Sequence, residues 1–186
     1  MTRDLLRGLI LFSALALGAG ALSQEDDIFS FIPQGGRTLL ENLAAEGLPP
    51  GLEAAIAAES GDADHWRAAL DTAADSAPGL DALDGWQRDT LAGYLAVRAP
   101  LPPGAELPRD GRDMTLALCQ SCHIITVVVT QDRTRVAWLR TLNAPSHVEI
   151  GTTPEERGLL ADYLVINAGI PIDLVPPALR AGGASY

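Results

Sequence analysis

Apolar residues recur at three- and four-residue spacing through most of the chain after residue 36, which is typical of helices that bury one face. Proline and glycine interrupt this pattern at 48–51 and 76–79. The pattern predicts an all-α protein. Its helices are expected near 37–46, 50–59, 63–75 and 83–97, followed by a second helical unit from 111 to about 170.

Residues 99–110 contain four prolines and cannot be helical throughout, because proline lacks the amide hydrogen that a helix interior requires. This stretch divides the chain into two halves. The expected organisation is a signal peptide at 1–23, an extended lead-in at 24–36, a helical N-terminal region at 37–98, a proline-rich linker at 99–110, a second helical domain at 111–173 and an irregular tail at 174–186.

The first 23 residues resemble a secretory signal. Arg3 and Arg7 precede an apolar run, and Ala21-Leu22-Ser23 places small residues where a signal peptidase cleaves. The apolar run is shorter than the roughly 20 residues that span a membrane. We therefore expect export to the periplasm as a soluble protein; an uncleaved membrane anchor is the alternative.

The chain is strongly acidic, with 24 Asp and Glu against 13 basic residues and a formal net charge of -11. All 13 basic residues are arginine, and they form no cluster that could follow a phosphate backbone. The composition therefore argues against nucleic-acid binding. It favours a basic or arginine-rich protein partner, because net charge acts on association.

The only cysteines of the chain stand in the sequence Cys119-Gln120-Ser121-Cys122-His123. In a helical turn, residues at i, i+3 and i+4 share one face. Two thiols on that face can each bond to one vinyl group of a haem, and the histidine can bind its iron. The alternatives are a redox-active dithiol, a zinc site that would also need His147, and a plain disulfide.

Residues 111–170 resemble a class I cytochrome c domain. The resemblance rests on Gly111 and the helix that leads to Cys119, on Trp138 in a middle helix, and on a terminal helix that begins after Thr153 and contains Tyr163-Leu164. It implies one covalently attached haem c, with Cys119 and Cys122 as attachment points and His123 as an axial iron ligand.

The chain departs from this family at the sixth iron ligand. The family usually supplies a methionine well after the haem histidine, but the only methionines here are Met1 and Met114, and Met114 is expected to pack in the core. His147 lies in the interval where the ligand is expected, so we predict that it ligates the iron. An iron left open, or a ligand of another kind, is the alternative.

Several other residues have predicted roles. Arg133 and Arg135 follow the motif closely and could bind a haem carboxylate, or could lie in a solvated loop. We expect His65 on the surface, and Trp66 and Trp86 in the core of the first half.

The segments 91–102 and 160–171 resemble each other at an offset of 69 residues. One explanation is that the first half is a degenerate cytochrome-like repeat. The other is that two amphipathic helices of similar composition both end in a turn.

The resemblance implies an exported mono-haem cytochrome that transfers electrons to or from a periplasmic redox partner, rather than an enzyme. The segment 131–138 is also similar to cytochrome subunits of periplasmic molybdenum oxidoreductases such as sulfite dehydrogenases, which favours a subunit of an oxidoreductase. The alternative function is a haem with an open iron that acts in peroxide or gas catalysis or sensing.

Overall fold

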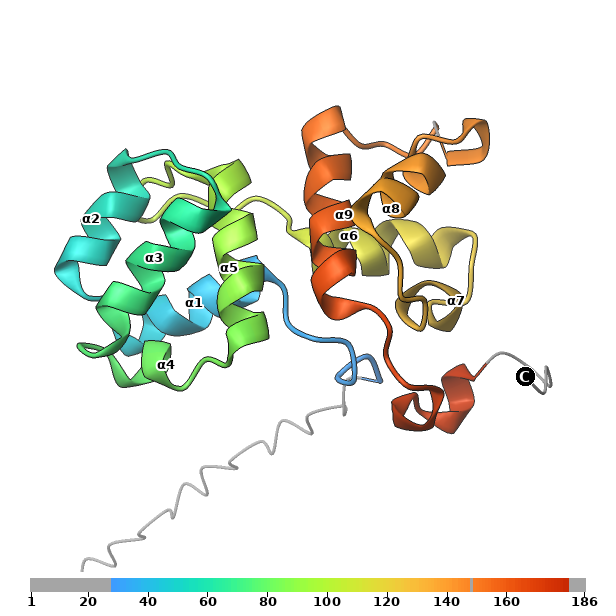
Figure 1. Ribbon diagram of the computed structural model, residues 1–186, viewed down its shortest axis with the longest axis horizontal. Helices are drawn as coiled ribbons and strands as arrows, with labels where there is room; N and C mark the ends of the chain where they lie inside the picture. Colours follow the sequence, from blue (N-terminus) through green and yellow to red (C-terminus); the bar gives the residue numbers. More distant parts are fainter. Residues whose placement is uncertain (1–27, 148, 181–186) are drawn as a thin grey trace, which may run out of the picture.

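The structure is a computed structural model that describes residues 28–147 and 149–180; the predicted signal peptide lies outside this part of the chain. The described residues form helices and no β-strand, so the predicted all-α class is confirmed. None of the helices in the described part is long and apolar enough to cross a membrane. Figure 1 shows the helices gathered into two units, one before and one after the proline-rich segment.

The N-terminal unit contains the four predicted helices and a short fifth one. Asp62 and Asp84 accept hydrogen bonds from backbone amides at the starts of two of these helices, which fixes where they begin. The sequence pattern missed the short helix, because its Pro78 was interpreted as a break although proline suits the first position of a helix. The helices of this unit are α1 (Gly36–Glu46), α2 (Pro50–Ala58), α3 (Ala63–Ala74), α4 (Pro78–Asp81) and α5 (Gly85–Arg98).

The C-terminal unit carries the cysteine motif. Its last long helix begins with the expected capping box, in which Thr153 and Glu156 bond to each other's backbone amides. The elements are α6 (Gly111–Leu118), η1 (Cys119–Ser121), α7 (Thr126–Val129), α8 (Arg135–Leu142), η2 (Pro145–His147) and α9 (Pro154–Asn167), followed by the single turns η3 (Ile172–Leu174) and η4 (Pro177–Leu179).

The two units share one hydrophobic core. The terminal helices α5 and α9 pack against each other, α1 packs on α5, and α6 packs on α9 (Figure 1). In both units the first helix begins with a glycine that lies against a tyrosine of the last helix, Gly36 against Tyr94 and Gly111 against Tyr163. A β-carbon on either glycine would lie only 2.2 or 2.1 Å from the tyrosine β-carbon, so each helix crossing depends on the missing side chain.

The middle helices α3 and α8 also correspond. Each begins after a residue whose side chain caps it, Asp62 or Thr134, and each has a buried tryptophan at its fourth position. These tryptophans are Trp66 and Trp138, and neither indole N–H has a hydrogen-bond partner among the described residues. The resemblance between the two halves is therefore not limited to one segment. It covers three pairs of helices: α1 and α6, α3 and α8, and α5 and α9.

Three expectations about single residues are decided by burial. Trp66 is fully buried, as predicted, but Trp86 is 65% exposed, so its assignment to the core was wrong. Trp86 is the second residue of α5 and lies one turn before Thr90, where the buried part of the helix begins. His65 lies on the surface, as predicted.

The lead-in reaches across to the second unit. Ile32 is buried against Ile125 and Val129, in a small cluster beside the cysteine motif. In addition, Arg37 of α1 donates two hydrogen bonds of 2.8 Å to Asp113, on the first turn of α6. The helix that leads into the motif is therefore held by the N-terminal half of the chain.

Candidate functional site

The cysteine motif lies where α6 changes into a tighter helical turn. The amides of Cys122 and His123 both donate to the carbonyl of Cys119, at 3.4 and 3.0 Å. This turn brings Cys119, Cys122 and His123 onto one side of the helix end, and all three line the same cavity. The predicted common face of the motif is confirmed, although the motif itself is not regular α-helix.

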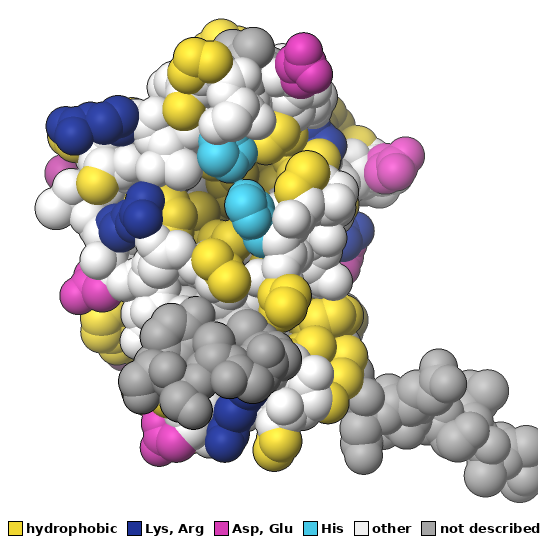
Figure 2. Space-filling view, turned by 90° about the vertical axis from the view of Figure 1, so that its right-hand side faces the viewer, with side chains coloured by type: hydrophobic (Ala, Val, Ile, Leu, Met, Phe, Trp, Pro, Cys, Tyr) yellow, Lys and Arg dark blue, Asp and Glu magenta, His cyan; other side chains and the backbone are white. Residues whose placement is uncertain are grey.

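The cavity has a volume of about 400 Å³, within the range of roughly 300–1,000 Å³ that is usual for ligand sites. Figure 2 looks onto its mouth and shows a hollow with a hydrophobic floor and histidine side chains at its rim. Its apolar walls come from α6, α7, α8 and α9. They include Leu118, Val127, Val128, Trp138, Leu142, Ile150, Leu160 and Leu164.

His147 lies at this cavity with His123, although 24 residues separate them in the sequence. The two imidazole rings have centroids 6.0 Å apart and planes inclined by 31°. The Nδ1 atom of His147 lies 3.1 Å from the hydroxyl of Ser146, which leaves its Nε2 atom available to another partner. The structure therefore brings together all four residues that the sequence singled out.

This spacing fits two imidazoles that share one metal ion. With metal–nitrogen bonds of about 2.0 Å, two rings on opposite sides of a metal have centroids about 6.4 Å apart. The observed centroid separation of 6.0 Å is close to that value. The donor set of two thiols and two neighbouring histidines at one cavity fits a covalently attached haem.

The cavity wall also offers a group that suits a carboxylate. The Nε1 atom of Trp138 is buried with no hydrogen-bond partner among the described residues, although Trp138 lines the cavity. The Nε1 atom itself is shielded from the open cavity, so the donor that lines the cavity here is the guanidinium of Arg133. Arg133 lies beside Trp138, with its guanidinium carbon 5.2 Å from the centre of the Trp138 ring and one nitrogen 2.9 Å from Thr141. Haem carboxylates are acceptors of the required kind.

Arg135 does not contribute to this cavity. Its side chain is half exposed and pairs with Asp162, at 2.5 and 3.3 Å, so it connects α8 to α9. Of the two alternatives for Arg135, a contact with a haem carboxylate or a solvated loop, neither describes its position: it is the first residue of α8 and is not among the residues that line the cavity. Arg133 precedes α8 and faces the cavity.

The cysteines are free thiols of different exposure. Cys119 is half-buried, and burial raises the pKa of its thiol to about 11, whereas Cys122 is exposed. A raised pKa keeps the Cys119 sulfur protonated at neutral pH, which does not favour a redox-active thiolate. Within the described residues, no three His, Cys, Asp or Glu side chains gather as a zinc site would require.

Three further residues bear on the site: one lies where the sequence predicted it, and two were not predicted. Met114 is fully buried in the core and is not among the residues that line the cavity. Ser146 and Arg157 were missed. Arg157 lines the cavity and donates to Thr152 and Asn143, at the two ends of the loop that carries His147. In the sequence, the available signal for Arg157 was its position one turn after Thr153, the residue that caps α9.

Comparisons with family models, curated proteins and solved structures find no match for this chain.

Proposed function

We propose that this chain is an exported mono-haem c-type cytochrome that transfers electrons. Cys119 and Cys122 would hold the haem covalently, and His123 and His147 would bind its iron. The observation that carries the proposal is that His123 and His147, with ring centroids 6.0 Å apart, line one cavity together with both cysteines. The haem would supply one-electron chemistry, and the chain's own groups would keep it in place.

The protein groups around the cavity support a closed electron-transfer site rather than a catalytic one. An iron with two histidine ligands has no free position for peroxide or a gas. Histidine in place of methionine also lowers the expected reduction potential, because a methionine ligand raises it. The cavity walls are mainly apolar, and Arg133 offers a donor for a haem carboxylate.

The proposed partner is a periplasmic redox protein or the catalytic subunit of an oxidoreductase. Charge is divided unevenly: residues 28–107 contain 12 Asp and Glu against 4 Arg, whereas residues 108–180 contain 8 against 7. The N-terminal unit therefore supplies most of the acidic charge that would attract a basic partner. The cavity lies in the C-terminal unit, which is nearly neutral. Electrostatic attraction would then act through the N-terminal unit and weaken with salt.

We further propose that the N-terminal unit is a cytochrome-like repeat without a haem. The Gly36–Tyr94 and Gly111–Tyr163 contacts, and the capped tryptophan helices α3 and α8, support this proposal. With Gly36 and Gly111 aligned, the positions of Cys119, Cys122 and His123 are occupied by Ala44, Gly47 and Leu48. None of these three residues can attach a haem or bind its iron.

Expression in a bacterium that has the periplasmic haem-attachment machinery tests the proposal. The exported wild-type protein should retain haem after denaturation, and the haem should be reduced and reoxidised reversibly. Cys119→Ala/Cys122→Ala should lose covalent haem, whereas the matched pair Ser121→Ala/Ser146→Ala should keep it. A wild-type protein that carries no covalent haem under these conditions would refute the proposal.

A further inference from the structure

The loop between α8 and α9, residues 143–153, carries His147 but has no buried side chain among its described residues. Burial of apolar surface therefore does little to fix the position of the His147 ring. The loop is instead held by hydrogen bonds within it, from the amide of His147 to Ala144 at 2.8 Å and from the amide of Ile150 to His147 at 3.2 Å. A loop of this kind needs attachments outside itself to hold one conformation.

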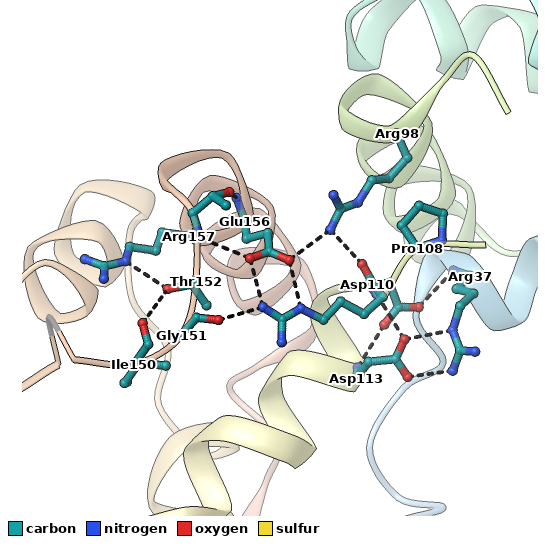
Figure 3. A network of polar contacts seen from close by, with 12 residues as sticks. Arg37, Arg98, Pro108, Asp110, Asp113, Ile150, Gly151, Thr152, Glu156 and Arg157 are labelled. Atoms are coloured by element: carbon teal, nitrogen blue, oxygen red, sulfur yellow. Dashed lines mark hydrogen bonds and ion pairs between the residues drawn. The ribbon is translucent and has the colours of Figure 1, made fainter. Parts of the chain in front are cut away.

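Two arginines provide such attachments (Figure 3). Arg157 of α9 donates to Thr152 at 2.9 Å and to Asn143 at 3.1 Å, and so connects the two ends of the loop. Arg109 donates to the carbonyl of Gly151 at 2.8 Å. Arg157 belongs to the helix that follows the loop, whereas Arg109 belongs to the linker between the two units.

The guanidinium of Arg109 is itself fixed in orientation. It donates two hydrogen bonds of 2.8 Å to the two carboxylate oxygens of Glu156, a residue whose side chain is only 14% exposed. A fork of this geometry holds the guanidinium in one plane. Glu156 also accepts the amide of Thr153 at 3.0 Å, so one carboxylate fixes both the end of the loop and the arginine that holds it.

The N-terminal unit completes this network. Arg98, the last residue of α5, lies 3.6 Å from Glu156 and donates to the carbonyl of Arg109 at 2.9 Å. A continuous series of contacts therefore runs from α5 through Glu156 and Arg109 to Gly151, four residues after His147.

We propose that Arg109 is a positioning residue for His147, through which the N-terminal unit keeps the imidazole at the cavity. This inference rests on the proposed function, because it assigns His147 to the iron. Arg109 is not in contact with the cavity and takes no part in haem attachment. Its effect is to restrict the loop, so that the His147 ring would stay at the position from which it would bind the iron.

The test compares Arg109→Ala with the wild type and with a control, Arg135→Ala. The control removes another arginine–carboxylate fork on α9, that of Arg135 with Asp162, which does not involve the loop. Carbon monoxide binding to the reduced protein reports how often His147 leaves the iron. We expect Arg109→Ala to bind carbon monoxide about tenfold faster, as loss of one charge-assisted hydrogen bond implies, and Arg135→Ala to bind at the wild-type rate.

Hydrogen exchange of the loop amides gives a readout that does not depend on the iron. Exchange in 143–153 should accelerate in Arg109→Ala and not in Arg135→Ala. If Arg109→Ala does not fold, Glu156→Gln serves instead, since it keeps an acceptor for the Thr153 amide but weakens the fork. Unchanged exchange and unchanged carbon monoxide binding in the folded variant would refute the positioning role.

Arg109→Lys separates positioning from charge. A lysine retains the charge but cannot bond to both Glu156 oxygens and Gly151 in the geometry of the fork, so we expect an intermediate rate. A rate equal to that of the wild type would contradict the positioning role. The proposed function is tested separately. It fails if the His147→Ala variant has the same haem spectrum as the wild type.

Discussion

The hydroxyl of Tyr163 donates a hydrogen bond of 2.6 Å to the carbonyl of Pro33, 130 residues earlier in the chain. The relationship is reciprocal, since Tyr94 donates at 2.8 Å to the carbonyl of Pro108. Each proline stands three residues before the glycine that begins the first helix of a unit. The last helix of each unit therefore holds the segment that enters the first helix of the other unit, and neither unit is complete alone.

Replacement of Tyr163 by phenylalanine tests this reciprocal arrangement. Tyr163→Phe leaves the Pro33 carbonyl without its donor, and we expect a loss of about 1 kcal/mol in the free energy of unfolding. Tyr94→Phe should cost a similar amount. Urea unfolding measures both, with the exposed Thr72→Ala as a control expected to change by less than about 0.5 kcal/mol. Tyrosine variants as stable as the wild type would show that these bonds contribute nothing.

Glycine at the start of α6 is predicted to be required for packing. An added β-carbon at Gly111 would lie 2.1 Å from that of Tyr163, so Gly111→Ala must push α6 and α9 apart. We expect a loss of roughly 1–3 kcal/mol in the free energy of unfolding. Gly93→Ala, in the middle of α5 with open space around it, is the matched control and should stabilise the protein by up to about 1 kcal/mol. Equal effects at the two positions would contradict the close crossing.

The ion network at Glu156 predicts a specific dependence on pH. Hydrogen bonds from Arg109 lower the pKa of Glu156 to about 2, below its ordinary value of 4.5. A lowered pKa stabilises the folded state at pH values above about 4.5, and this contribution is lost as the pH falls towards 2. Because Arg109 is partly exposed and solvent screens the pair, we expect a contribution on the order of 1–3 kcal/mol.

The difference in unfolding free energy between the wild type and Glu156→Gln isolates this contribution. It should be largest near pH 6 and shrink steadily from pH 5 to pH 2. The subtraction removes the contribution of Asp110 to the pH dependence. Burial raises the pKa of Asp110, so its contribution to stability changes with pH in the opposite direction. A difference that does not vary with pH would contradict the assignment of the network to Glu156.

Local signals predicted the helices well. Caps such as Thr153 and Asp62, and the prolines and glycines between helices, act within a few residues, so the helix bounds follow from neighbouring residues. Trp86 was misplaced because a tryptophan near a helix start was assumed to be buried, whereas the buried face of α5 begins at Thr90.

The site was predicted in part. The spacing of Cys119, Cys122 and His123 carries its own chemical meaning, and His147 followed from the absence of a later methionine. The contacts of Ile32 with the second unit, and of Arg109 with Gly151, could not be predicted, because they join residues far apart in the chain. They depend on how the two units pack, which helix periodicity does not specify.

The most direct test of the central claim is the optical spectrum of the exported protein, oxidised and reduced, before and after addition of carbon monoxide, for the wild type and His147→Ala. For the wild type we predict a low-spin, six-coordinate haem that does not bind carbon monoxide at once. For His147→Ala we predict an open iron that binds carbon monoxide readily, with the haem still attached. Identical spectra for the two proteins, or a wild-type iron that binds carbon monoxide immediately, would contradict the assignment of His147 and favour a haem open to catalysis or gas sensing.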